Sequence, residues 1–132
     1  MEIRSKCHLC GELENMEHIL LDCQESIAMR IIWELARELW LRRECEWPEI
    51  SYGIILGCNL LTFRSKSKIS YGKSRLFTIL VSEAANLVWK LRCERIFKMH
   101  GDHTKFHSTE EIRNKWIFTI NSRLKFDQLY TN

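Results

Sequence analysis

In the stretch CHLCGELENMEHILLDC, residues 7–23, three cysteines and one histidine have the spacing of a transition-metal site. They are Cys7, Cys10, His18 and Cys23. Only two residues separate the first two cysteines, so both sulfur atoms can reach one ion from a single tight turn. Three cysteines and one histidine are typical of a structural zinc site, in which protein fills all four tetrahedral positions. The stretch therefore predicts a closed Zn²⁺ site rather than a catalytic one.

The residues between these ligands fit that prediction. Gly11 directly follows the second cysteine, where the chain must turn and where a positive φ costs glycine little. Glu14 and Asn15 precede residues 16–21 and can cap a short helical turn that directs His18 towards the metal. The gap between this histidine and the last cysteine is about one helical turn, so we expect both to face the same ion.

The cysteine pattern is also compatible with two alternatives to a metal site. A cysteine-rich chain could place one histidine nearby by chance, or Cys7 and Cys10 could form a disulfide. The paired spacing argues against chance, and the absence of a visible signal peptide argues against oxidation. The remaining cysteines, Cys45, Cys58 and Cys93, are far apart and show no pairing pattern. We therefore expect a reducing, intracellular compartment, nuclear or cytoplasmic.

The composition is that of an ordinary globular protein. The chain has 132 residues, and a domain of this length can bury about two thirds of its unfolded surface. A single proline and five glycines argue against a turn-rich β architecture. The net charge of +3 permits a nucleic-acid surface but does not require one. No apolar run is long enough to cross a bilayer, so we expect no membrane partner.

Two segments after the ligand stretch have the hydrophobic periodicity of amphipathic helices. The first spans about residues 25–43 and the second, which is more apolar, about residues 74–99. In the first, Ile27, Ile31, Leu35 and Leu39 recur at four-residue steps, and they are flanked by Ile32, Ala36 and Trp40. Glu83 interrupts the apolar face of the second, so we expect it to pair with an arginine of another helix.

A third helix is predicted where the capping-box pattern Ser108-x-x-Glu111 begins a segment that runs to about residue 130. Residues 44–73 are irregular, and they contain a short apolar run that periodicity cannot assign to strand or helix. The sequence therefore predicts an all-α fold. We expect an N-terminal zinc knuckle over residues 1–24, packed on a three-helix bundle over residues 25–132 with one irregular connection.

The ligand stretch, from Lys6 to Cys23, resembles the reverse-transcriptase zinc-binding domain at the C-terminal end of non-LTR, LINE-type retrotransposon proteins. The motif of that family is two closely spaced cysteines, a histidine and a final cysteine, and all four positions match. Residues 76–95 are similar to a helix with a Trp-Lys-x-Arg pattern that follows the knuckle in such proteins. The chain most resembles retroelement-derived reading frames of fungi.

The resemblance implies a non-catalytic module that binds RNA or DNA beside a polymerase. The polymerase motif Tyr-x-Asp-Asp is absent, and we find no nucleophile–base pair, glycine-rich phosphate loop or paired carboxylates. We therefore expect no enzyme activity and no small-molecule substrate. On this resemblance the chain is a C-terminal fragment or a degenerate gene product. The alternative is a structural or protein-interaction module from a degenerate or co-opted retroelement, without nucleic-acid binding.

Basic residues supply candidate contacts to phosphate groups. They are Arg4 and Lys6 before the first ligand, and Arg64, Lys66 and Lys68 in a polar stretch that we interpret as an exposed loop. A solvated loop is the simpler interpretation of the second group. The knuckle contains no aromatic residue for base stacking. A grip on nucleic acid would then be electrostatic, or would use Trp40 or Trp47 from the bundle.

Overall fold

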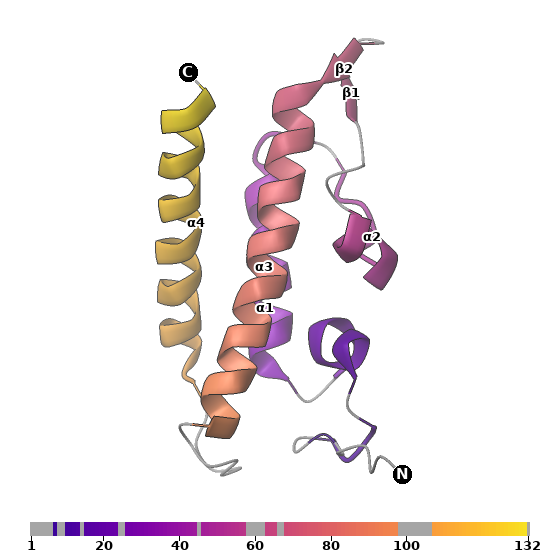
Figure 1. The fold of residues 1–132 in the computed structure, drawn as a ribbon, viewed down its shortest axis with the longest axis vertical. Coiled ribbons are helices and arrows are strands. Elements are labelled where there is room, and N and C mark those ends of the chain that lie inside the picture. Colours follow the sequence, from indigo (N-terminus) through magenta and orange to yellow (C-terminus); the bar gives the residue numbers. More distant parts are fainter. Residues whose placement is uncertain are drawn as a thin grey trace.

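Three long helices dominate the fold, as the hydrophobic periodicity predicts (Figure 1). A computed structural model of the chain describes residues 7, 10–13, 15–23, 26–44, 46–57, 63–65, 68–97 and 107–131. Its elements are η1 (His18–Asp22), α1 (Ile27–Leu41), α2 (Tyr52–Gly57), β1 (Phe63–Ser65), β2 (Lys68–Ser70), α3 (Tyr71–Phe97) and α4 (Thr109–Thr131). The predicted all-α class is confirmed, with one short hairpin added to it.

Helix α1 begins at a capped turn and buries one face. The Ser26 hydroxyl accepts a hydrogen bond from the Met29 amide at 3.2 Å, which satisfies a donor of the first turn. The buried residues of this helix are Met29, Ile32, Ala36 and Trp40. Their spacing of three and four residues places them on one side of the helix. This face is the one that α1 turns towards the rest of the bundle.

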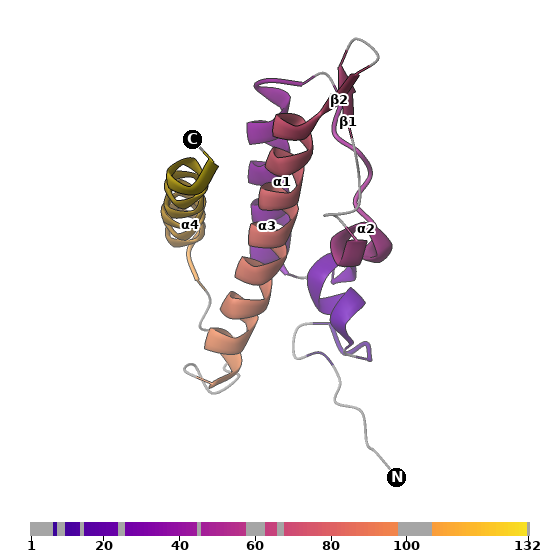
Figure 2. The same ribbon diagram turned by 45° about the horizontal axis from the view of Figure 1, so that its top comes forward.

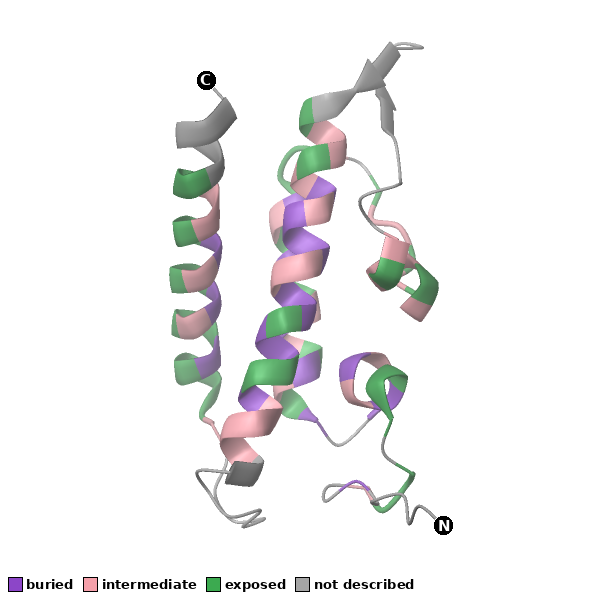
Figure 3. Ribbon diagram, in the orientation of Figure 1, coloured by how far each residue is buried: buried purple, intermediate pink, exposed green. Residues whose placement is uncertain are grey.

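The three long helices pack on one another around a shared core. Helix α1 contacts both α3 and α4, and α3 also contacts α4. Figure 1 shows α4 on one side of α3, while η1 and α2 lie on its other side, and Figure 2 shows the same order from a turned view. Buried side chains follow the inner faces of these helices (Figure 3). Helix α3 is therefore the central element, and it has neighbours on several sides.

An aromatic cluster closes the end of α1. The rings of Trp40 and Phe77 lie 5.5 Å apart between centroids, at an edge-to-face angle of 75°. Trp47 contacts both rings, with centroid distances of 5.9 Å to Trp40 and 5.5 Å to Phe77. The Trp40 indole N–H also donates a hydrogen bond to the Glu46 carbonyl. These contacts tie the start of the connection to the core, because buried aromatic pairs add to the energy of area burial.

The connection between α1 and α3 contains a short helix and a hairpin. The undecided apolar run is helical, since it forms α2. The interpretation of residues 64–68 as a loop is corrected, because β1 and β2 pair antiparallel there, with Arg64 opposite Ile69. Two residues separate the strands in sequence, which is the shortest common hairpin connection. Helix α3 begins directly after β2, earlier than the periodicity predicts.

Polar contacts fix α4 on α3. Arg123 donates a hydrogen bond to the Glu83 carboxylate at 2.9 Å, so the expected pairing of Glu83 with an arginine of another helix is confirmed. At the start of α4, the Ser108 hydroxyl accepts a hydrogen bond from the Glu111 amide at 3.1 Å, as the capping pattern predicts.

In the part of the chain that the structure describes, no helix is long and apolar enough to cross a membrane.

Candidate metal centre

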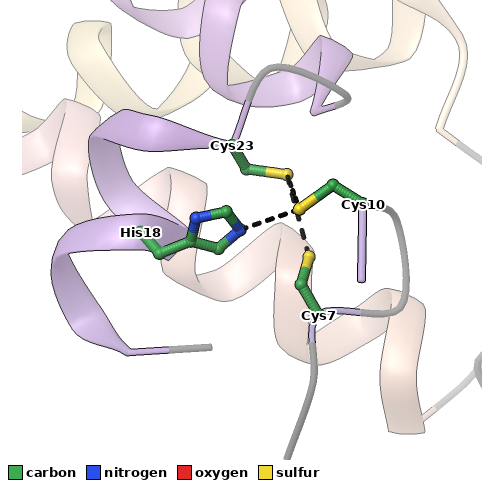
Figure 4. Close-up of side chains that lie close together, drawn as sticks. All are labelled: Cys7, Cys10, His18 and Cys23. Atoms are coloured by element: carbon green, nitrogen blue, oxygen red, sulfur yellow. Dashed lines mark hydrogen bonds between the residues drawn. The ribbon is translucent and has the colours of Figure 1, made fainter. Parts of the chain in front are cut away.

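The four predicted ligands meet in one cluster at the N-terminal end of the molecule (Figure 4). The sulfur atoms of Cys7, Cys10 and Cys23 and a ring nitrogen of His18 all lie within 4.8 Å of one another. Sγ of Cys23 is 3.7 Å from Sγ of Cys7 and 3.9 Å from Sγ of Cys10. Nε2 of His18 is 3.2 Å from Sγ of Cys10. These atoms lie close enough together to bind one metal ion.

The measured separations fit a tetrahedral zinc site. Zinc–sulfur bonds of about 2.3 Å place two sulfur ligands of a tetrahedron about 3.8 Å apart. The two sulfur–sulfur distances from Cys23, 3.7 and 3.9 Å, lie on either side of this value. A disulfide would need about 2.05 Å. None of the three cysteines forms a disulfide in the structure, so the alternative of a Cys7–Cys10 disulfide is not found.

The turn between the first two ligands depends on Gly11. Its φ of +80° lies in the left-handed region, which glycine adopts without steric cost. Its amide donates a hydrogen bond to the Cys7 carbonyl at 3.0 Å, and the Cys7 amide donates one to the Glu12 carbonyl at 2.7 Å. A Cβ atom at this position would meet nothing within 4 Å. The requirement for glycine therefore comes from the backbone conformation and not from lack of space.

A π-helical turn brings the histidine and the last cysteine together. The Asn15 side chain accepts a hydrogen bond from the His18 amide at 2.8 Å, which confirms the predicted cap. The chain then leaves α-helical geometry, because the Cys23 amide bonds to the His18 carbonyl five residues back, at 3.0 Å. In an α-helix, residues five apart point about 140° away from each other. The wider turn reduces this angle, so both ligands can face one ion.

The cluster is attached to the bundle through η1. Leu20 is buried in the core, and the Trp33 indole N–H of α1 donates a hydrogen bond to its carbonyl at 2.7 Å. Helix α3 contacts η1 from the other side. Cys7 and Cys23 are buried, with exposed fractions of only 6% and 2%. A knuckle packed on the helices is what the sequence predicts.

The structure does not bring the candidate nucleic-acid contacts together with the metal cluster among the residues that it describes. Arg4, Lys6 and Lys66 lie outside the described residues. Arg64 and Lys68 lie on the paired strands β1 and β2, remote in sequence from the cluster. The suggestion that Trp40 stacks on bases is wrong, because this side chain is 1% exposed on the inner face of α1. Trp47 is half-buried in the same aromatic cluster.

Sequence reasoning did not connect Arg92 and Arg95, or the Trp89 ring on which Arg92 lies, with the candidate metal centre. Trp89 is 39% exposed on α3, and the guanidinium carbon of Arg92 lies 5.2 Å from the centre of its ring. Arg92 and Arg95 both line a small cavity together with Cys7, His18 and Cys23. The signal was present in the sequence as basic residues on an otherwise apolar side of the second helix.

Comparison of the chain with family models, curated proteins and solved structures finds no match.

Proposed function

We propose that this chain is a non-catalytic module in which Cys7, Cys10, His18 and Cys23 hold one Zn²⁺ ion. The observation that carries the proposal is the clustering of the four ligand atoms, which all lie within 4.8 Å of one another. Soft thiolate ligands with one imidazole favour Zn²⁺ over magnesium or calcium, which prefer oxygen. When bound, the ion supplies cross-linking of the segment and adds its binding free energy to folding.

The proposed role is structural because the protein supplies every ligand. A catalytic zinc site keeps one coordination position for water or substrate, whereas a four-ligand site has none. Three of the ligands, Cys7, His18 and Cys23, are also buried. A substrate approaching the ion would have to displace a ligand and part of the packing on α3. These features support a module that binds a partner without transforming it.

We further propose that the partner is nucleic acid, RNA or DNA. The support is the resemblance of the ligand stretch to the reverse-transcriptase zinc-binding domain of LINE-type elements, together with a net charge of +3. A chain of this charge binds phosphate backbones mainly by releasing counterions. The binding is then expected to be moderate in affinity and strongly dependent on salt.

Two measurements test this function. Native mass spectrometry of protein purified under reducing conditions should find one Zn²⁺ per chain, and chelation should remove it together with the order of residues 7–23. Fluorescence anisotropy with a labelled single-stranded RNA and a labelled DNA duplex should show an affinity that falls linearly in a plot of log K against log salt. A chain that contains no zinc would contradict the proposed metal site. A zinc-bound chain that binds neither the RNA nor the DNA at low salt would contradict the proposal of a nucleic-acid partner.

A second candidate function is a protein-interaction or purely structural module. The observation that favours it is the exposure of two adjacent apolar side chains of α4, since Ile117 and Phe118 are 51% and 75% exposed. Large apolar side chains on the surface of a helix are typical of contact sites when they cluster. Binding that does not change with salt, measured on the zinc-bound chain, would favour this candidate over nucleic acid.

A further inference from the structure

We infer that Arg92 and Arg95 of α3 are positioning residues of the metal centre, and that Trp89 holds Arg92 in place. In this arrangement the two guanidinium groups balance the charge of the buried thiolates and fasten the knuckle to the bundle. The inference rests on the proposed zinc site, and it adds an outer layer to the four ligands. Partners of this kind commonly orient metal ligands and tune their affinity.

The two arginines belong to the side of α3 that faces the cluster. Val88, Arg92 and Arg95 are spaced by four and three residues, which places them on one stripe of the helix. All three line the cavity that Cys7, Cys23 and other residues of the N-terminal segment close from the opposite side. The volume of this cavity is about 20 Å³, little more than one water molecule needs. Arg92 and Arg95 thus share one small cavity with the candidate ligands Cys7, His18 and Cys23.

The formal charge of the centre explains why cations are needed there. Three thiolates, a neutral imidazole and Zn²⁺ sum to one negative charge. Burial of an unbalanced charge is costly, and Cys7 and Cys23 are 6% and 2% exposed. Water therefore screens these two sulfurs poorly. Helix α3 supplies two permanent positive charges to the same cavity, because guanidinium groups stay protonated at all physiological pH values.

A cation–π contact with Trp89 holds the Arg92 guanidinium in place. The guanidinium carbon of Arg92 lies 5.2 Å from the centre of the Trp89 ring, within the range of a cation–π interaction. The indole is 39% exposed, so the arginine reaches from the surface of α3 to the wall of the metal cavity. A planar guanidinium can stack on the ring and donate hydrogen bonds at its edge, which an ammonium group does less well. Stacking on Trp89 therefore restricts the positions that the Arg92 guanidinium can adopt.

Lys90 provides a matched control on the same helical turn. It is exposed and lines the groove between α3 and α4, on a different side of α3 from the metal cavity. Lys90→Gln therefore removes the same charge as Arg92→Gln without touching the centre. If the arginines acted only through the overall charge of the protein, the two substitutions would have equal effects.

The test is the zinc affinity of the full chain, measured by competition with a chromophoric chelator under reducing conditions. Arg92→Gln and Arg95→Gln should each weaken zinc binding about 10–100-fold, the usual effect of losing an outer partner of a metal ligand. Arg92→Lys should recover part of this loss, Trp89→Ala should lose less than Arg92→Gln, and Lys90→Gln should stay within about twofold of the parent chain. Cobalt substitution should show the thiolate-to-cobalt band of the parent shifted in Arg92→Gln but not in Lys90→Gln.

The outcomes separate the inference from the proposed function. A parent chain that binds no zinc overturns both. A parent chain that binds zinc, with equal affinities in Arg92→Gln and Lys90→Gln, overturns the inference alone. Circular dichroism of each variant with zinc checks the helices, and Arg92→Lys decides the matter should Arg92→Gln fail to fold. Equal zinc affinities in Arg92→Lys and the parent, together with an unshifted cobalt band, would then count against a role for the planar group.

Discussion

The bundle and the N-terminal segment are stabilised by different means. Helices α1, α3 and α4 share a continuous core of buried apolar side chains. Among the described residues of this N-terminal segment, Leu20 belongs to the core and Ile19 and Leu21 pack against it. The other buried side chains described there are the candidate metal ligands Cys7, His18 and Cys23. Their polar contacts are mostly local turns and caps. We therefore expect the bundle to fold on hydrophobic burial, and we expect the short N-terminal segment to depend on the proposed metal ion.

The largest expected effect is a loss of zinc binding and local order in the N-terminal segment while the bundle stays folded. Cys23→Ser removes one thiolate from the cluster, and we expect it to abolish stoichiometric zinc binding and the protection of η1 amides from hydrogen exchange. Helices α1, α3 and α4 should stay folded, because their core does not include the metal. Native mass spectrometry and hydrogen exchange resolved along the chain measure both halves of the prediction.

The control for this substitution is Cys93→Ser. Cys93 is a free, half-buried cysteine of α3 that lies outside the cluster. It should leave zinc stoichiometry and η1 protection unchanged. Full zinc stoichiometry and an unchanged melting curve in Cys23→Ser would refute the ligand assignment, and loss of all helices on chelation would show that the two regions are one cooperative unit.

A smaller but still large effect should come from the core of the bundle. Trp40 is 1% exposed and contacts Trp47 and Phe77. Trp40→Ala should lower the free energy of unfolding by about 3–5 kcal/mol, because the cavity it leaves can relax only in part. Urea denaturation followed by circular dichroism measures this loss. Phe118→Ala, at a side chain 75% exposed, should change stability by about 0.5 kcal/mol or less, and equal losses in the two variants would contradict the core assignment.

The smallest expected effect on stability comes from removing one capping side chain in each region. Asn15 caps the turn before η1 and Ser108 caps α4, each through a side-chain oxygen. Replacement by alanine should cost about 1 kcal/mol in each case, but the two losses should appear in different measurements. Asn15→Ala should weaken zinc binding several-fold with little change in the urea midpoint of the bundle, and Ser108→Ala should do the reverse. Identical profiles would mean that the regions do not fold separately.

The sequence predicts the ligands well because their information is local. Four ligand types within one short stretch identify the site without knowledge of the fold, and Gly11 and Asn15 act as expected. The π turn between His18 and Cys23 was not predictable, because its residues suit an α-helix equally well and only the cluster requires the wider turn. Arg92 and Arg95 were missed for a different reason: which side of α3 meets the knuckle depends on tertiary packing.

The same limit applies to the bundle. The central series predicted on α1 begins at Ile27, which is 50% exposed, and its other members are only partly buried. The residues predicted to flank it, Ile32, Ala36 and Trp40, are the buried ones. Helix α1 is apolar over much of its circumference, so periodicity identifies a helix but not the side that α3 and α4 cover. The hairpin of β1 and β2 was missed because its serines and lysines have the composition of a loop. The buried side of α1 depends on contacts with helices far apart in the chain, whereas the hairpin pairs neighbouring segments whose composition does not indicate strands.

The position of Arg92 and Arg95 on α3 has a consequence for synthesis. The ligand segment leaves the ribosome first, and the helix that covers it follows only after α1 and the hairpin have been made. Domains generally fold in the order in which they emerge, but here the first segment must wait for a distant one. We therefore expect nascent chains to acquire the ion in an exposed and exchangeable form, which cellular chelators can still remove. Docking of α3 would then turn a labile metal complex into an inert one.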